Sequence, residues 1–178
     1  LVMLQKRLEL EDIMHDVEIP LLMFFIALFM IVGGVEGSGF LEYLGTFIIP
    51  FVKEDFLLAC IILMWVAAIM SAAIDNIPFT AAMIPIILSI ETQGVNVAAL
   101  WWCLALGVGM GGNGTHIGST ANVFIVTVSE RLARDTGDPS MAITPLMWAK
   151  KGLPVMLLTL VICTIVMYLF FPYYSQPI

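Results

Sequence analysis

Charged residues are scarce in this chain of 178 residues, and their scarcity indicates its class. Only 12% of the residues are charged, whereas a soluble domain has about 25%. Hydrophobic residues make up 61% of the chain, and a domain of this size has too little interior to bury so many of them. These proportions exclude an ordinary soluble enzyme and a disordered tail. The sequence therefore predicts an all-α integral membrane protein.

Basic residues, cysteine and histidine are also few. Seven Lys and Arg against 14 Asp and Glu give a formal charge of −7, which argues against nucleic acid and against a general affinity for anionic surfaces. The cysteines stand singly in apolar runs, with no pairing pattern, and the histidines are too far apart for a metal cluster: they are Cys60, Cys103, Cys163, His15 and His116. No cofactor is expected. The N-terminal residues show no signal-peptide pattern. Because the sequence begins with Leu and not with Met, we expect a piece of a longer protein.

Stretches without charge indicate the membrane segments. A spanning helix needs about 20 apolar residues to cross a hydrocarbon core of about 30 Å. Residues 19–37 and 152–172 each fit one span. Residues 38–53 contain Gly45 and Pro50, are too short to cross, and are predicted to lie at the interface.

Residues 54–91 and 97–130 do not fit simple spanning helices. The first stretch is interrupted at a tip, residues 75–78, and its second arm would be only about 18 Å long. A re-entrant hairpin fits these lengths better than two full spans, which are the alternative. The second stretch is too long for one straight helix and is predicted to be a broken helix, unwound at residues 111–115.

The basic residues predict the orientation, because cytoplasmic loops collect Lys and Arg. Residues 1–18 and 131–151 are the predicted cytoplasmic lead-in and connection, with six basic side chains: Lys6, Arg7, Arg131, Arg134, Lys150 and Lys151. Only Lys53 falls on the other side. We therefore expect a multi-pass protein of the cell membrane (inner or plasma membrane), with its N-terminus in the cytoplasm and its C-terminus outside.

Asp75 is the only ionisable residue in residues 56–90. A carboxylate at membrane depth is costly unless it lies in a water-filled or ion-lined cavity. Asp75 or Asn76 can cap the returning helix, with Pro78 in its first turn, and such a helix start aims backbone N–H groups at an ion. Thr80, one turn further on, adds a hydroxyl group. The alternative is a plain surface turn between two helices.

Glycines and polar residues are concentrated in residues 111–122. Unwound backbone is tolerated at membrane depth only where protein or a water-filled cavity satisfies its polar groups. Broken helices of this kind hold substrates and coupling ions in secondary transporters. The candidate binding residues are Gly112, Asn113, Gly114, Thr115, Ser119, Thr120 and Asn122. The alternative is helix packing through the small-residue pairs Gly107/Gly111 and Gly114/Gly118.

Two further features carry less weight. The glycines at 107, 109 and 112 match a dinucleotide-binding fingerprint, but they follow a membrane-length apolar run rather than a short strand. His116 is a candidate proton relay, although a lone histidine is more often a hydrogen-bonded structural residue.

The two motifs together resemble the ion transporter superfamily, in the citrate-transporter-like branch that includes arsenite permeases, D-type sodium–proton antiporters and the melanosomal P protein. The resemblance is carried by Asp-Asn-Ile-Pro-Phe-Thr at residues 75–80 and by Gly-Gly-Asn-Gly-Thr at residues 111–115, followed by Ile117-Gly118 and Ala121-Asn122. The span after Asp16 also resembles the one that opens the second half of these proteins.

The resemblance implies two inverted repeats, each with scaffold helices, a re-entrant helical hairpin and a broken transmembrane helix, and this chain is similar to the second repeat alone. It implies that half of a substrate and cation site is formed by Asp75, Asn76, Thr80, Asn113, Thr115 and Asn122, with a sodium site at Asp75, Asn76 and Asn113. The site would move across the membrane in an elevator-like motion. His116 and Ser119-Thr120 depart from the family pattern, which leaves the substrate open.

We therefore predict a secondary active transporter of a small ion, either an inorganic anion such as arsenite or a carboxylate, coupled to protons or sodium. The alternatives are a sodium–proton antiporter and a non-transporting structural subunit of the membrane. An enzyme is not expected, because an intramembrane aspartyl hydrolase needs two membrane aspartates and only Asp75 is present. The expected partners are the substrate ion, the lipid bilayer, an N-terminal repeat and a second copy in a homodimer.

Overall fold

The computed structural model describes residues 52–176 continuously, and before them positions 23, 26, 27, 29–31, 33, 34, 37–39, 43 and 50. All regular secondary structure in these residues is helical, as the composition predicts. The lead-in predicted at residues 1–18 lies outside the described residues. Most of the span predicted at 19–37 and of the interfacial segment predicted at 38–53 also lies outside them.

Helices α4 (Phe56–Ala73) and α5 (Asn76–Glu91) follow one another across a two-residue turn. Helix α4 starts at an N-cap, where the side chain of Asp55 accepts a hydrogen bond from a backbone N–H of the first turn. It ends where Ile74 takes an extended conformation. Asp75 then caps α5, so the chain reverses with both helix ends satisfied.

Helices α6 (Ala98–Gly111) and α7 (Thr120–Thr136) are separated by residues 112–119, which form turns. We call this non-helical segment the break. Helix α7 ends at Gly137, which has a φ of 69° and therefore occupies the left-handed region where glycine is favoured.

The chain then passes through a short 3-10 turn, η2 (Pro139–Met141), into the longest helix, α8 (Pro145–Leu169), and a last turn, α9 (Phe171–Tyr174). Helix α8 has 25 residues, or about 37 Å at 1.5 Å per residue. The connection predicted at residues 131–151 is helical at both of its ends, since α7 continues into it and α8 begins within it.

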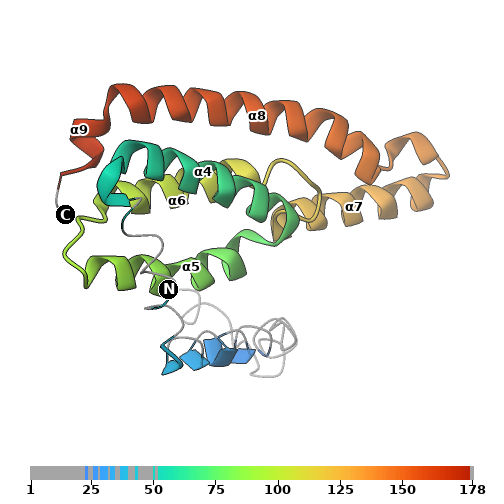
Figure 1. Cartoon of the computed structure of the whole chain (residues 1–178). Coiled ribbons are helices and arrows are strands. Elements are labelled where there is room, and N and C mark those ends of the chain that lie inside the picture. The colour runs from blue at the N-terminus through green and yellow to red at the C-terminus, as the bar shows by residue number, and fades with distance from the viewer. Residues whose placement is uncertain are drawn as a thin grey trace, which may run out of the picture.

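Helices α4 and α6 pack against each other at close range, and α8 runs alongside them (Figure 1). Two glycines of α6 make the approach possible. A Cβ atom on Gly107 would lie 2.3 Å from the carbonyl oxygen of Met64, and one on Gly111 would lie 2.3 Å from that of Ala68. The pair Gly107/Gly111 therefore serves contact between helices of this chain.

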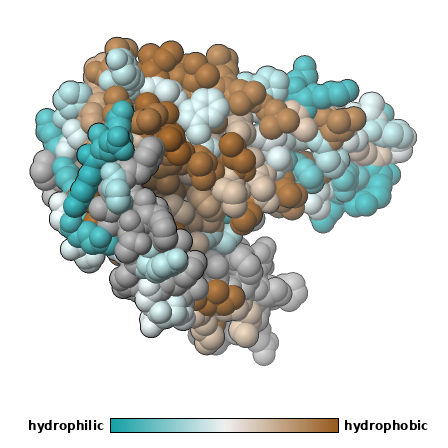
Figure 2. Space-filling model, in the orientation of Figure 1, coloured by the Kyte–Doolittle hydropathy of each residue, from teal (hydrophilic) through white to brown (hydrophobic). Residues whose placement is uncertain are grey.

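Large apolar side chains cover much of the outer surface, above all along α8. Among the described residues, two stretches are long and apolar enough to cross a membrane: Phe56–Ala73, which is α4, and Pro139–Leu169, which contains α8. Figure 2 shows hydrophobic residues over α8 and hydrophilic ones at the end where α7 joins it. This distribution is typical of a membrane protein.

Candidate functional site

One side chain joins the start of α5 to the start of α7. Asp75 accepts a hydrogen bond from the backbone N–H of Ile77 through Oδ1 (3.0 Å) and another from the hydroxyl of Thr120 through Oδ2 (2.7 Å). The second bond is a long-range link, because 45 residues separate its two partners. The positive ends of two helix dipoles therefore meet at the Asp75 carboxylate.

The neighbouring Asn76 is held by a serine inside the protein. Ser71 is fully buried, and its hydroxyl oxygen lies within hydrogen-bond distance of two acceptors, Oδ1 of Asn76 and the carbonyl oxygen of Val108 (3.0 Å), which share its single proton. This one hydroxyl thus links α4, the tip and the last turn of α6. Because the Ser71 hydroxyl lies in the protein interior, this contact holds the Asn76 side chain against α4 and α6.

The break is tied to its surroundings by its own polar groups. The hydroxyl of Thr115 donates to the carbonyl oxygen of Ala72, near the end of α4. Nδ2 of Asn122, in the first turn of α7, donates to the carbonyl oxygens of Gly112 (2.7 Å) and Thr115 (3.2 Å). These bonds satisfy backbone carbonyls that helix geometry leaves open, and they give the break a defined conformation.

Three glycines allow the break to approach its neighbours closely. A Cβ atom on Gly112 would lie 2.8 Å from Nδ2 and 2.9 Å from Oδ1 of Asn76, and one on Gly118 would lie 2.9 Å from the carbonyl oxygen of Gly112. At Gly114 the nearest atom would be the sulfur of Met156, at 2.5 Å. The amide of the tip therefore lies directly on the backbone of the break.

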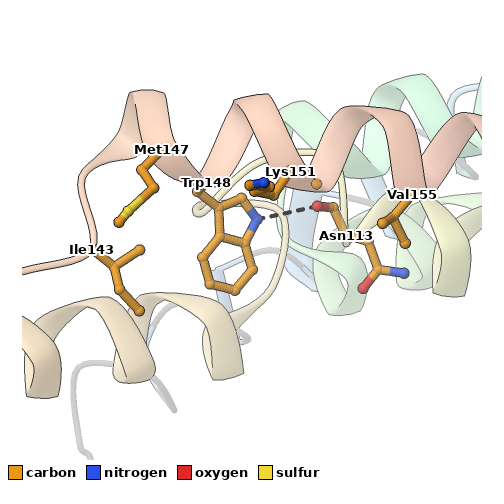
Figure 3. Close-up of a pocket in the computed structure, with 7 residues that line it drawn as sticks. Asn113, Ile143, Met147, Trp148, Lys151 and Val155 are labelled. Atoms are coloured by element: carbon orange, nitrogen blue, oxygen red, sulfur yellow. Dashed lines mark hydrogen bonds between the residues drawn. The ribbon is translucent and has the colours of Figure 1, made fainter.

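Asn113 faces a different neighbour, the first half of α8. The indole N–H of Trp148 donates to its carbonyl oxygen (3.1 Å), as Figure 3 shows. A Cβ atom on Gly152 would lie 2.2 Å from that same oxygen. Asn113 also lines a cavity of about 370 Å³ whose other walls come from α8 and the residue Ile143. The structure therefore places Asn113 against α8. Among the described residues, Asn113 forms no hydrogen bond with Asp75 or Asn76.

We call the region where the tip meets the break the junction. The remaining predicted residues lie around it but do not link the tip to the break. Thr80 donates to the carbonyl oxygen of Asn76 in its own helix (2.8 Å), and both residues line a cavity of about 320 Å³. Ser119 is the N-cap of α7, but its side chain makes no capping hydrogen bond. His116 is half-buried in the break and forms no hydrogen bond with any residue that the structure describes.

Two residues at the junction were not predicted from the sequence. Ser71 is the only hydroxyl-bearing residue in α4, and its place five residues before Asn76 was a weak signal that spacing alone could not interpret. Trp148 falls outside the predicted spans, and nothing in the sequence relates its indole to the backbone of the break.

The chemistry that this junction offers is that of neutral oxygens with one carboxylate. Among the described residues, no group of three or more His, Cys, Asp or Glu side chains could hold a metal ion. Any cation bound here would therefore depend on Asp75 together with amide, hydroxyl and backbone carbonyl oxygens. Hard cations accept such oxygen ligands.

Comparison with known proteins gives an independent view of the chain. Residues 1–107 match the family model described as citrate transporter. This segment includes the turn between α4 and α5 and ends before the break. No solved structure matches the chain significantly.

Several curated proteins align with most of the chain. A P protein from Sus scrofa is 41% identical over 131 residues, which are 69% of this chain and 16% of that protein. A 46 kDa membrane protein of Mycobacterium leprae is 30% identical over 166 residues, 92% of this chain and 37% of that protein. An uncharacterized transporter of Mycobacterium tuberculosis is 32% identical over 165 residues, with shares of 91% and 37%. The chain therefore spans between about a sixth and two fifths of the length of these relatives.

Proposed function

This chain belongs to the citrate transporter family, and on that premise we propose that it forms part of a secondary active transporter of a small anion, coupled to sodium or protons. The anion would be a carboxylate or an inorganic anion such as arsenite. The family is one of transporters and not of enzymes. The observation that carries the proposal is the hydrogen bond between Asp75 and Thr120, which joins two helix starts across 45 residues.

In this proposal α4 and α5 form a re-entrant hairpin, and α6, the break and α7 form one broken transmembrane helix. Figure 1 supports this arrangement, because the turn between α4 and α5 lies level with the break, while α7 and α8 extend well beyond both. Helix α5 has 16 residues, or about 24 Å, which is short for a hydrocarbon core of about 30 Å. The hairpin and the broken helix would then move together, in an elevator-like motion, against scaffold helices.

The proposed mechanism assigns the coupling step to Asp75. Its carboxylate would take up the coupling cation, sodium or a proton, while amide and hydroxyl groups at the tip and the break hold the anion. The side chains that offer such groups at the junction are Asn76, Thr80, Thr115, Ser119, Thr120 and Asn122. Because Thr120 bonds to the same carboxylate, a bound cation would compete with this bond and so change how the tip and the break are held together.

The test is the flux of radiolabelled citrate, and separately of arsenite, into proteoliposomes of the full-length protein under a sodium or a proton gradient. We expect Asp75→Asn to reduce coupled flux to the background of empty vesicles, because the variant keeps the cap but loses the charge. The matched control is Asp55→Asn, at the N-cap of α4, which should leave flux unchanged. Equal flux in the wild-type and Asp75→Asn proteins would overturn the role of Asp75.

A sodium–proton antiporter is the second candidate. Among the described residues, the acidic group of the junction is the single carboxylate of Asp75, which sodium and a proton could occupy in turn. It predicts sodium-driven proton movement without citrate or arsenite, measurable with a pH-sensitive dye in the same vesicles. A non-transporting structural subunit is disfavoured, because Gly107 and Gly111 pack inside the chain and are not available to an outside helix.

The orientation is also part of the proposal. The basic residues between α7 and α8 support a cytoplasmic position for this connection, which places the C-terminal end of α8 outside. An N-terminal repeat and a second copy of the protein would complete the transporter as a homodimer.

A further inference from the structure

Four cationic side chains gather where α7 ends and α8 begins: Arg131, Arg134, Lys150 and Lys151. No carboxylate oxygen of the described residues lies within 4.0 Å of any of them. Glu130, Asp135 and Asp138 lie in the same segment, so residues 130–151 carry four cations against three carboxylates, a formal charge of +1 in a chain whose formal charge is −7. Figure 2 shows hydrophilic residues at this end of the molecule. A preference for an anionic partner at this end would therefore rest on single cations such as Lys151, and not on a basic patch.

One of these cations, Lys151, borders the cavity drawn in Figure 3. The cavity has a volume of about 370 Å³ and lies between the break and the first turns of α8. Two of its lining residues, Lys151 and Asn113, have polar side chains, and most of the lining is apolar or aromatic, from Ile143, Met147, Trp148, Gly152 and Val155. Such a cavity suits an anionic group that carries an apolar body.

The apolar wall of the cavity continues along the outside of α8. Starting from Val155, large side chains recur every three or four residues, which places them on one face of the helix. They are Val155, Leu158, Ile162, Ile165 and Leu169, and each is at least half exposed. A largely apolar cavity with one cation at its edge thus opens onto an apolar stripe about 20 Å long, at 1.5 Å per residue.

We propose that this cavity binds the headgroup of an acidic phospholipid, whose acyl chains lie along the stripe. The phosphate oxygens accept hydrogen bonds from the Lys151 ammonium and from the Asn113 amide. Trp148 lies where an interfacial tryptophan is expected, with its ring in the cavity wall and its N–H bonded to protein. Basic cavities beside transmembrane helices are suited to anionic headgroups.

This site gives the break a role outside the proposed transport cycle. The carbonyl oxygen of Asn113 is bonded to Trp148, and its side chain lines the same cavity. A bound lipid would therefore contact the break directly, on the side that faces α8. Lipid binding at this cavity does not depend on which ion is transported.

The experiment uses the full-length protein in phosphatidylcholine vesicles with graded amounts of phosphatidylglycerol that carries brominated acyl chains. Bromine quenches nearby tryptophan, and the contribution of Trp148 is obtained as the difference between the wild type and Trp148→Phe. We expect brominated phosphatidylglycerol to bind about fivefold more strongly than brominated phosphatidylcholine, the contribution of about one lysine near a membrane surface. Lys151→Gln should abolish this preference, whereas Lys150→Gln, outside the cavity, should retain it.

Three outcomes would overturn the proposal. Equal quenching by the two lipids in the wild type would show that the cavity has no preference for an acidic headgroup. An equal loss of preference in Lys151→Gln and Lys150→Gln would indicate diffuse surface charge in place of a site. A Lys151-dependent change of Trp148 fluorescence on adding inorganic phosphate, in vesicles without phosphatidylglycerol, would identify a site for a free anion. None of these readouts requires flux, so they remain interpretable if the transport proposal fails.

Discussion

The junction of α4, α6 and the break differs from α8 in how its helices meet their surroundings. In α4, 39% of the residues are buried inside the molecule, against 17% in the most apolar 18 residues of the stretch Pro139–Leu169, which contains α8. Small residues bring α4 and α6 together, as at Gly107 and Gly111, whereas α8 directs Leu, Ile and Val outward.

The difference follows from what each region has to satisfy. The break exposes backbone N–H and C=O groups that hydrocarbon cannot satisfy, so neighbouring helices must come close enough to supply partners. Helix α8 continues without a break and satisfies its own backbone except at Pro154, which has no N–H to donate to the carbonyl oxygen of Lys150, so it needs little beyond an apolar environment. The helices around the junction must therefore pack closely, whereas side chains on the outer face of α8 should tolerate substitution.

The largest effect is expected from filling the contact between α4 and α6. In Gly111→Leu, the new side chain would start 2.3 Å from the carbonyl oxygen of Ala68, so the two helices must separate. Overpacking costs about 1–3 kcal/mol and can exceed this where backbone lies opposite. We expect Gly111→Leu to lose the monodisperse peak in size-exclusion chromatography of the detergent-solubilised protein.

The control for this prediction lies two residues away on the same helix. A Cβ atom on Gly109 meets nothing within 4 Å. Gly109→Leu should therefore elute and unfold like the wild type. If both variants behaved alike, the contact between α4 and α6 would not set the stability of the fold.

The next prediction tests whether the inner face of α8 contributes more to the stability of the fold than its outer face. Leu160 is fully buried, whereas Leu158 is 63% exposed. Truncating a buried leucine costs about 2–5 kcal/mol, and an exposed one much less. Thermal unfolding in detergent should therefore show a clear drop for Leu160→Ala and little change for Leu158→Ala. Equal drops would mean that the outer face of α8 is also packed in the folded protein.

Much of the fold could be predicted from the sequence, because lipid restricts what a chain can do. The scarcity of charge and the long apolar stretches predicted an all-helical membrane protein, and two long apolar helices are present among the described residues. The bounds of the segments, the re-entrant hairpin and the broken helix stay predictions. The break runs on to residue 119, further than the glycines indicated, because side chains such as Thr115 and Asn122 bind the backbone there. Helix boundaries of this kind depend on tertiary contacts.

The candidate site was harder to predict for the same reason. Sequence patterns select residue types that suit ion binding, but they do not say which way each side chain faces. Asp75 and Thr120 are hydrogen-bonded, whereas Asn113, only two residues after the end of α6, turns toward α8. Ser71 was overlooked because a single serine in an apolar helix has many ordinary roles.

A smaller effect is expected at the polar side chain that holds the break. Asn122→Asp keeps the shape of the side chain but removes the two N–H groups that bind the carbonyl oxygens of Gly112 and Thr115. Leaving such acceptors without a donor costs about 1–3 kcal/mol. Asn96→Asp is the control, because Asn96 donates to one exposed carbonyl, that of Ser175, and Asp can still accept from Ala98. The melting temperature should fall further for Asn122→Asp.

The smallest change in stability is expected for Thr120→Val, which removes the hydrogen bond to Asp75 while keeping the size of the side chain. The bond is exposed, so its loss should cost about 1 kcal/mol or less in thermal unfolding. Thr127→Val removes a comparable bond within α7 itself and serves as the control. If the bond between Asp75 and Thr120 takes part in coupling, citrate flux in proteoliposomes should fall in Thr120→Val far more than its small loss of stability explains. If Thr120→Val and Thr127→Val both reduced flux only slightly and to the same extent, the bond between Asp75 and Thr120 would have no part in coupling. The functional contact between the tip and the break would then be limited to Ser71 and Asn76.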